Sequence, residues 1–199
     1  MLKKKIDTIH TFEAVSPVMR RAFNALGNGP PGPVVVETPS DIASKELPEE
    51  LFSTYSSPQT ALTAPSKSNI KEAVKTLLAA KKPVIWAGQG VLFAQATEQL
   101  RELAELTEIP VFTSMPGKSA IDERHPLSLG AGSESTTLPA RTWVQESDVL
   151  FAIGSSLTNT PYGQSIPKGK LIIQNTINPD DINKDQSVEI GLIGDAKLT

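Results

Sequence analysis

The 199-residue sequence contains no cysteine and two histidines, His10 and His125. Without cysteine the chain cannot form disulfides, use a thiolate nucleophile or bind zinc through sulfur. Aromatic residues make up 5% of the sequence. No apolar run approaches the roughly 20 residues that a membrane-spanning helix requires. These absences exclude a disulfide-rich secreted protein and a sulfur-ligated zinc protein, and they predict no membrane partner.

The chain also lacks a marked excess of either charge. Lys and Arg number 19 against 22 Asp and Glu, for a net charge of -3, and the basic residues are scattered. Proteins that bind the phosphate backbone of nucleic acids carry clustered basic residues, so we expect no nucleic-acid partner. The basic residues at 3–5 are not followed by the apolar segment of a signal peptide. We therefore expect a cytoplasmic protein.

Residues 1–45 carry the pattern of one helix and one strand. Ser16-Pro17 is a typical helix start and Gly27 a typical end. Between them apolar residues share one helical face, at Val18, Ala22 and Leu26. Residues 33–37 include three consecutive valines, which is typical of a buried strand.

Residues 46–68 and 69–199 differ sharply in pattern. The first segment is rich in serine, threonine and proline, which bury little, so it predicts an interdomain linker. Asn69 followed by Glu72 predicts the start of a helix. Further helices are expected across 93–104 and near 139–145, and strands at 84–87, 111–113, 149–153, 171–173 and 188–193. This alternation predicts an α/β domain with a Rossmann-like open parallel sheet and helices on both faces.

Ligands of an open parallel sheet bind beyond the carboxyl ends of its strands, where glycine lets the backbone approach and free N–H groups hold phosphate. Four segments fit this description: one strand-to-helix turn, two strand ends and one loop before a helix. Their candidate nucleotide-binding residues are Gly88, Gln89, Gly90, Thr113, Gly130, Gly132, Gly154 and Ser155. A single Gly-x-Gly is more often a tight turn than a nucleotide site. Both interpretations stay open at this point.

Two other groups are weaker candidates. His125 is a candidate base, but its acidic neighbours are adjacent in sequence, so we expect a histidine that packs in a loop. Asp180, Asp181 and Asp185 lack the spacing of a calcium loop. Pro179 followed by two aspartates predicts the start of a short helix instead. The sequence thus predicts no catalytic residue and no metal site.

Several segments in order resemble one known family. Residues 32–42 resemble the end of the pyrimidine-binding domain of thiamine-diphosphate-dependent enzymes, the family of acetolactate synthase, pyruvate oxidase and benzoylformate decarboxylase. Residues 69–199 resemble the central domain of the same family. The matching segments are Ala80-x-x-Pro83-Val84-Ile85-x-Ala87-Gly88-x-Gly90, Ile109-Pro110-Val111-x-Thr113, His125-Pro126-Leu127-x-x-Gly130, Ser147-Asp148-Val149-Leu150-x-x-x-Gly154 and Gly191-Leu192-Ile193-Gly194-Asp195-Ala196.

The resemblance implies the central portion of a 2-oxo-acid decarboxylase or synthase of the acetolactate synthase type. Its implied partners are the pyrimidine-binding and pyrophosphate-binding domains of the same protein, within a homo-oligomer. Thiamine diphosphate and magnesium would bind in the complete enzyme alone. Glu37 belongs to the last strand of its domain and is not the family's activating carboxylate, and Gly194-Asp195-Ala196 imitates the start of the metal-binding Gly-Asp-Gly motif. We expect Asp195 to cap a helix and the chain by itself to be catalytically silent.

In some relatives the central domain holds FAD, in oxalyl-CoA decarboxylase it holds ADP, and in others it is empty. The FAD contacts carry over onto the glycines, Thr113 and Ser155 named above. Two departures weaken such a site, because Ser156 replaces an arginine and Thr176, two residues before Asn178, replaces an acidic residue that holds the ribose. We therefore favour an empty or weakly binding domain, with an autonomous FAD- or ADP-binding module as the alternative. A sirtuin-like deacylase, suggested by the segment 130–133, is disfavoured because the zinc cysteines are missing.

Overall fold

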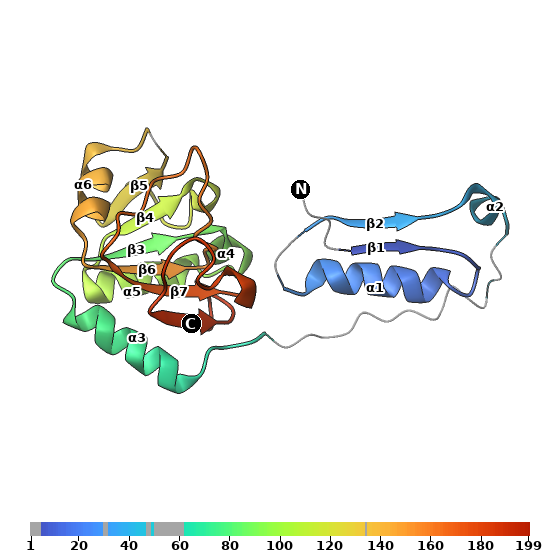
Figure 1. Ribbon diagram of the computed structural model, residues 1–199, viewed down its shortest axis with the longest axis horizontal. Coiled ribbons are helices and arrows are strands. Elements are labelled where there is room, and N and C mark those ends of the chain that lie inside the picture. The colour runs from blue at the N-terminus through green and yellow to red at the C-terminus, as the bar shows by residue number, and fades with distance from the viewer. Residues whose placement is uncertain (1–4, 30–31, 47–48, 50–61, 134) are drawn as a thin grey trace. The chain divides into compact units, whose positions relative to one another are not determined.

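The computed structural model describes residues 5–29, 32–46, 49, 62–133 and 135–199. The chain divides into two compact units, Met1–Ala61 and Leu62–Thr199, drawn in Figure 1. Most of the predicted linker at 46–68 lies outside the described residues. The predicted domain bounds 1–45, 46–68 and 69–199 therefore stay predictions.

The first unit is a strand–helix–strand motif with a short helix after it. Its elements are β1 (Lys5–Thr8), α1 (Val15–Gly27), β2 (Val34–Glu37) and α2 (Ser40–Ala43). β1 and β2 pair in parallel, with Ile6 opposite Val35, and α1 lies along both strands (Figure 1). α1 buries Val18 and Ala22, whereas Leu26, which we expected on the same face, is exposed. The prediction of a buried strand is also wrong for β2, whose valines are half-buried against a single long helix.

The second unit is built on a six-stranded sheet in which every pair of neighbouring strands is parallel. Its strands are β3 (Pro83–Ala87), β4 (Val111–Ser114), β5 (Ser128–Gly132), β6 (Val149–Ile153), β7 (Leu171–Thr176) and β8 (Ile190–Ile193). Across the sheet their order is β5-β4-β3-β6-β7-β8. The chain moves outward from β3 to β5, returns to β6 beside β3, and moves outward again to β8. This confirms the predicted Rossmann-like parallel sheet, with the strand order reversing between β3 and β6.

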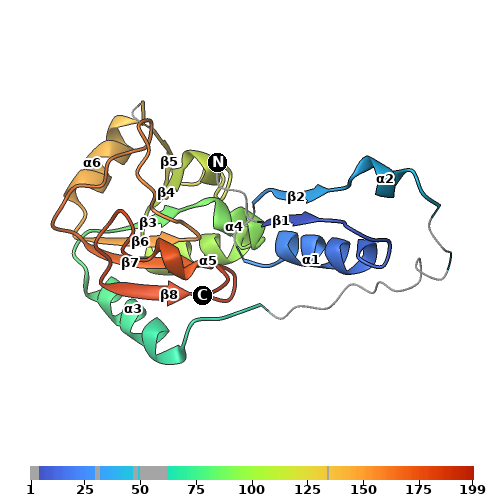
Figure 2. The ribbon, with the colours of Figure 1, turned by 45° about the vertical axis from the view of Figure 1, so that its right-hand side comes forward.

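Helices cover both faces of this sheet, as predicted. One face carries α3 (Lys67–Ala79), α4 (Gln89–Phe93) and α5 (Thr97–Thr107), and the other carries α6 (Leu138–Glu146). Side chains alternate along each strand, so Ile85 packs toward α3 and α5 while Val84 and Trp86 pack toward α6. Figures 1 and 2 show α3 running beside β8. Among the described helices none is both long and apolar enough to span a bilayer.

Two predictions about helix boundaries were wrong. α3 begins at Lys67 rather than near Asn69, because the hydroxyl of Ser66 accepts a hydrogen bond from the N–H of Asn69 at 3.2 Å. The helix predicted across 93–104 is two helices, α4 and α5, since Gln95 has a φ of 52° that a helix cannot accommodate. Phe93, which we expected to point inward, is exposed as a result.

At the amino ends of the central strands, one carboxylate joins two segments distant in sequence. Asp148 accepts hydrogen bonds from the N–H groups of Lys81 at 2.7 Å and Lys82 at 2.9 Å. Burial raises the pKa of the Asp148 carboxyl, but the N–H donors together outweigh it and leave that pKa below its usual value. The ionised carboxylate thus fastens the entry of β3 to the entry of β6.

Replacing Ser66 by alanine should lower the free energy of unfolding by about 1 kcal/mol, because α3 loses its N-cap. Asn69→Ala is the matched control, since it keeps the backbone N–H that donates to Ser66 and alanine is a strong helix former. Urea denaturation followed by circular dichroism measures both changes. A larger loss in Asn69→Ala than in Ser66→Ala would contradict the assignment of the cap.

Asp148→Asn should destabilise the protein at pH 7 and much less at acidic pH. A carboxyl whose pKa is lowered on folding stabilises the folded chain above its unfolded pKa, near 4, and loses this contribution as the pH falls. Urea midpoints for wild type and variant at about pH 7 and about pH 3 test the trend. Replacement of the exposed Glu102 by Gln is the control. A difference in urea midpoint between wild type and Asp148→Asn that stays constant with pH would refute the role of Asp148.

Candidate functional site

The turns that follow β3 and β6 lie against each other where the strand order reverses. The N–H of Gly88 donates to the carbonyl of Ile153 at 2.9 Å, and that of Gly90 to the carbonyl of Gly154 at 2.8 Å. A Cβ on Gly90 would lie 2.7 Å from the Cα of Gly154, closer than any side chain tolerates. These glycines are therefore required for contact between two backbones.

Gly154 is held in place by a buried amide. Its φ of +59° favours glycine, and its N–H donates to Oδ1 of Asn175 at 3.0 Å. Nδ2 of Asn175 donates to the carbonyls of Leu192 at 3.1 Å and Gly194 at 3.0 Å, and to the hydroxyl of Thr199 at 2.9 Å. Asn175 is fully buried, so it ties the end of β6 to the end of β8.

The neighbouring side chain, Gln174, is also fully buried. Its Nε2 donates to the carbonyl of Ser155 at 3.0 Å. Its Oε1 has no hydrogen-bond partner among the residues that the structure describes. Sequence reasoning missed Gln174 and Asn175. Their signal was two amides interrupting the apolar strand from Leu171.

The remaining predicted residues lie on β4 and β5. Thr113 is buried at the end of β4, where its hydroxyl lies 3.5 Å from the carbonyl of Gly130. Gly130 and Gly132 belong to strand β5, so the prediction of a loop at this point is wrong. A Cβ on Gly132 would lie 1.9 Å from Cζ of Phe112, so packing on that ring explains the glycine.

The segment after β5 folds back along the strand's outer edge. The hydroxyl of Thr137 donates to the carbonyl of Leu129 at 3.2 Å, and that of Thr136 to the carbonyl of Ala131 at 3.2 Å. An open groove of about 720 Å³ lies beside this edge. Met115, Lys118, Glu123, Gly130, Ser133 and Ser135 are among its lining residues. Its two charged side chains pair with each other at 3.4 Å, so the groove presents no field of one sign.

The structure therefore brings together one part of the predicted site. Gly88, Gln89, Gly90, Gly154 and Ser155 meet at the reversal of strand order, and Thr113 lies one strand away, following the pairing of Ala87 with Thr113. Gly130 and Gly132 lie a further strand away, on the edge strand β5. Contact between these residues and a nucleotide stays a prediction.

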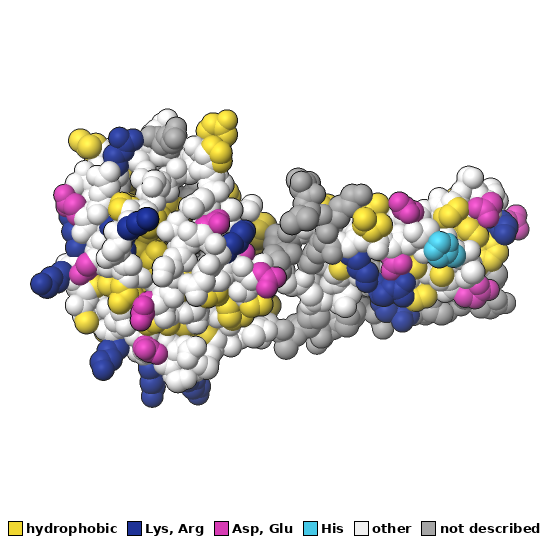
Figure 3. Space-filling view, in the orientation of Figure 1, with side chains coloured by type: hydrophobic (Ala, Val, Ile, Leu, Met, Phe, Trp, Pro, Cys, Tyr) yellow, Lys and Arg dark blue, Asp and Glu magenta, His cyan; other side chains and the backbone are white. Residues whose placement is uncertain are grey.

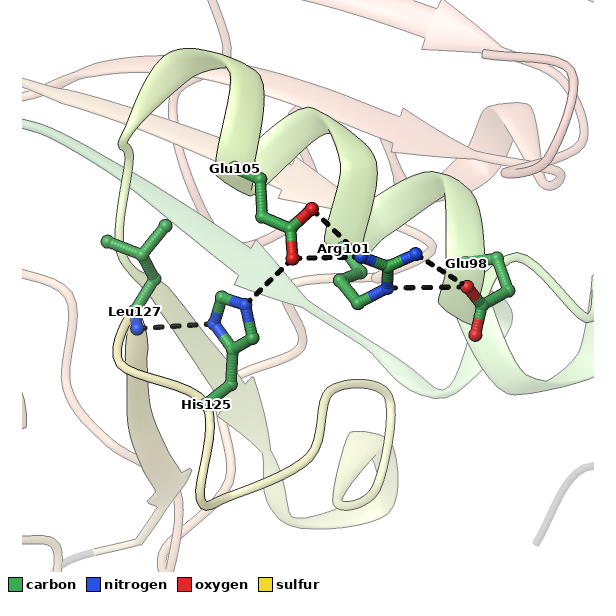
Figure 4. A network of polar contacts seen from close by, with 5 residues as sticks. All are labelled: Glu98, Arg101, Glu105, His125 and Leu127. Atoms are coloured by element: carbon green, nitrogen blue, oxygen red, sulfur yellow. Dashed lines mark hydrogen bonds and ion pairs between the residues drawn. The ribbon is translucent and has the colours of Figure 1, made fainter.

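His125 takes part in a polar network that joins α5 to the segment before β5 (Figure 4). Its Nδ1 accepts a hydrogen bond from the N–H of Leu127 at 3.2 Å, which places the proton on Nε2, 3.2 Å from Oε1 of Glu105. Arg101, and then His125, hold the pKa of the Glu105 carboxyl below its usual range. Both ring nitrogens are thus engaged, in keeping with a packing histidine. Its acidic partner comes from α5 and not from its sequence neighbours.

The aspartates after β7 stabilise their own turn. Pro179–Asp181 forms the expected short helix, a single 3-10 turn. Oδ2 of Asp181 accepts from the hydroxyl of Thr176 at 2.9 Å, and Oδ1 accepts from Nδ2 of Asn178 at 3.2 Å. Asp185 accepts from the N–H of Asn159 at 2.9 Å. Across the described part of the chain no three acidic or histidine side chains gather as a metal site would require.

Asp195 occupies the position that imitates a metal-binding motif. It is buried, and its Oδ1 accepts hydrogen bonds from the N–H groups of Lys197 at 2.9 Å and Leu198 at 3.3 Å. This is the expected capping role, although the residues that follow form a turn and not a helix. A carboxylate turned onto its own backbone is not arranged to hold magnesium, so these residues do not fit the diphosphate of thiamine diphosphate.

Figure 3 shows that the basic side chains of residues 62–199 are scattered over the visible face.

Comparison with known proteins identifies the fold's family. The family model described as "Thiamine pyrophosphate enzyme, central domain" matches residues 70–199. The chain belongs to this family. It is similar to the "Probable acetolactate synthase large subunit" of Methanococcus aeolicus, with 37% identity over 190 residues covering 92% of this chain and 32% of the relative. It is also similar to the glyoxylate carboligase of Escherichia coli O157:H7, with 31% identity over 199 residues covering 98% of this chain and 33% of the relative.

A solved structure agrees with this membership. The benzoylformate decarboxylase of Polynucleobacter necessarius superposes with a TM-score of 0.78 at 25% identity, over 96% of this chain and 36% of that one. The chain thus spans about a third of the length of these relatives.

Asn175→Leu should lower the free energy of unfolding by about 3 kcal/mol, because it leaves the Gly154 N–H and two buried carbonyls without partners. Asn159→Ala, at an exposed asparagine in the same domain, should change it by less than about 0.5 kcal/mol. Chemical denaturation of the two variants beside wild type measures the difference. Equal effects would show that Asn175 does not hold the two strand ends together.

Proposed function

We propose that this chain supplies the central domain, with the last part of the pyrimidine-binding domain, of a thiamine-diphosphate-dependent 2-oxo-acid decarboxylase or synthase of the acetolactate synthase type. The observation that carries the proposal is the match over 70–199 together with 37% identity to a probable acetolactate synthase large subunit. The activity, substrates and partners of a complete enzyme are part of this proposal.

Within such an enzyme this chain acts as scaffold. Thiamine diphosphate, when bound in the complete enzyme with magnesium, would supply the carbanion chemistry on a 2-oxo acid. The described residues contribute a rigid parallel sheet whose strand ends are fixed by Asn175 and Asp148. A domain fixed in this way holds neighbouring domains at a constant separation and orientation.

Further features of the enzyme belong to the same proposal. Its partners would be the pyrimidine-binding and pyrophosphate-binding domains, it would assemble as a homo-oligomer, and it would work in the cytoplasm. The relatives' roughly threefold greater length supports partners of this kind. Residues 1–45 would belong to the pyrimidine-binding domain, in keeping with the exposed Ile6 and the half-buried valines of β2.

A domain exchange tests the proposal. Residues 69–199 would replace the corresponding segment of the Methanococcus aeolicus protein, and the chimera should assemble and form acetolactate from pyruvate when given thiamine diphosphate and magnesium. The purified 199-residue chain, assayed in parallel, should show no turnover. Size-exclusion chromatography monitors assembly.

Two results would count against the proposed role. The first is an assembled chimera that binds thiamine diphosphate and forms no product. The second is turnover of pyruvate by the 199-residue chain without any added domain. A second chimera carrying Asn175→Leu should lose assembly as well as activity, since its strand ends are no longer tied together.

A further inference from the structure

We infer that the two turns at the reversal of strand order form a closed structural contact in this chain, so that they do not hold the pyrophosphate of FAD or the diphosphate of ADP. The inference concerns the residues of this domain and is independent of the activity proposed above. It assigns a packing role to the glycines after β3 and β6. The resemblance to the family would instead suggest that these glycines bind a dinucleotide.

Three backbone donors after β3 are already in use. A pyrophosphate at such a turn needs several backbone N–H groups pointing at it. Here Gly88 donates to Ile153 at 2.9 Å, Gly90 to Gly154 at 2.8 Å and Val91 to Gly88 at 3.2 Å. α4 has five residues, little more than one turn, so its summed peptide dipole is far smaller than that of a long helix.

Three backbone donors after β6 are used in the same way. The N–H of Gly154 donates to the side chain of Asn175 at 3.0 Å, and that of Ser155 to the carbonyl of Asn175 at 3.2 Å. The N–H of Leu157 donates to the hydroxyl of Ser155 at 3.3 Å. A phosphate would have to replace bonds to a fully buried asparagine before it could bind.

The space between the turns is also filled. A Cβ on Gly88 would lie 2.3 Å from the carbonyl oxygen of Gly154, and one on Gly154 would lie 2.6 Å from the nitrogen of Val91. On the other side, the short 3-10 helix Met115–Gly117 closes on β3, since a Cβ on Gly117 would lie 2.5 Å from the carbonyl oxygen of Ala87. Backbone atoms from three segments thus pack directly against one another at these glycines.

The nearby side chains do not compensate. Ser156 shares a hydrogen bond of 2.9 Å with Thr158 and carries no charge for a phosphate. Thr176 stands where a carboxylate would accept the ribose hydroxyls, and its own hydroxyl donates to Asp181. Most backbone donors of the two turns are thus in use, their glycines pack against backbone atoms, and neither Ser156 nor Thr176 supplies a charge, so these residues do not fit the group.

Titration of FAD and of ADP into the purified 199-residue chain tests the inference directly. Isothermal calorimetry should detect no saturable binding with a Kd below about 100 μM for either ligand. Hydrogen exchange at residues 87–91 and 153–156 should be unchanged by either nucleotide. Stoichiometric binding with protection of these two segments would overturn the inference, whereas binding with protection elsewhere would support the closed contact.

A pair of variants tests the contact itself. Gly90→Ala should lower the melting temperature by about 5 °C or more, although alanine favours a helix, because its Cβ would meet the backbone of Gly154. Gly191→Ala is the matched control, since its Cβ would lie at 3.4 Å from the flexible Ile182 side chain, and it should shift the temperature by no more than about 2 °C. A Gly90→Ala protein as stable as wild type would show that the turns leave room and would overturn the inference.

Discussion

Direct contact between two backbones, at the carboxyl ends of β3 and β6, is the constraint on which the second unit depends. Three strands lie on each side of this junction, and their hydrogen-bonded sheet is continuous across it. The contact requires residues without a Cβ at positions 88, 90 and 154. It also requires an amide at 175, because one side chain must both accept from Gly154 and donate to the end of β8. Packing between the two turns thus explains the glycines at 88, 90 and 154 and the asparagine at 175.

The same constraint separates family membership from ligand binding. Glycines after the first strand of an open parallel sheet serve a dinucleotide where their N–H groups stay free, and serve the fold where those groups are bonded within the chain. Here the second description fits the distances. In this chain, packing alone is therefore sufficient reason for the glycines of the central domain.

Five of the six strands in the second unit, and the helices α3, α5 and α6, could be predicted because those strands are short and apolar and each of those helices carries one apolar face. The break between α4 and α5 at Gln95 could not be predicted, because the residue type does not indicate a left-handed conformation. β5 escaped prediction because its sequence, Ser-Leu-Gly-Ala-Gly, is small and glycine-rich, and its strand identity comes from pairing with β4 and from the ring of Phe112. The roles of Asn175 and Glu105 depend on partners about 20 residues away in the chain, which local patterns do not reveal.

The threonine hydroxyls along β5 have a consequence for how this domain behaves in concentrated solution. A bare edge strand offers its unpaired carbonyls as a template for a strand of another molecule, which leads to aggregation. Thr136 and Thr137 occupy the carbonyls of Ala131 and Leu129 with hydroxyls of the same chain. The positive φ of Gly130 and the shifted register beside it bend the strand further from a flat template. This edge of the sheet is therefore protected against intermolecular strand addition by its own connecting segment.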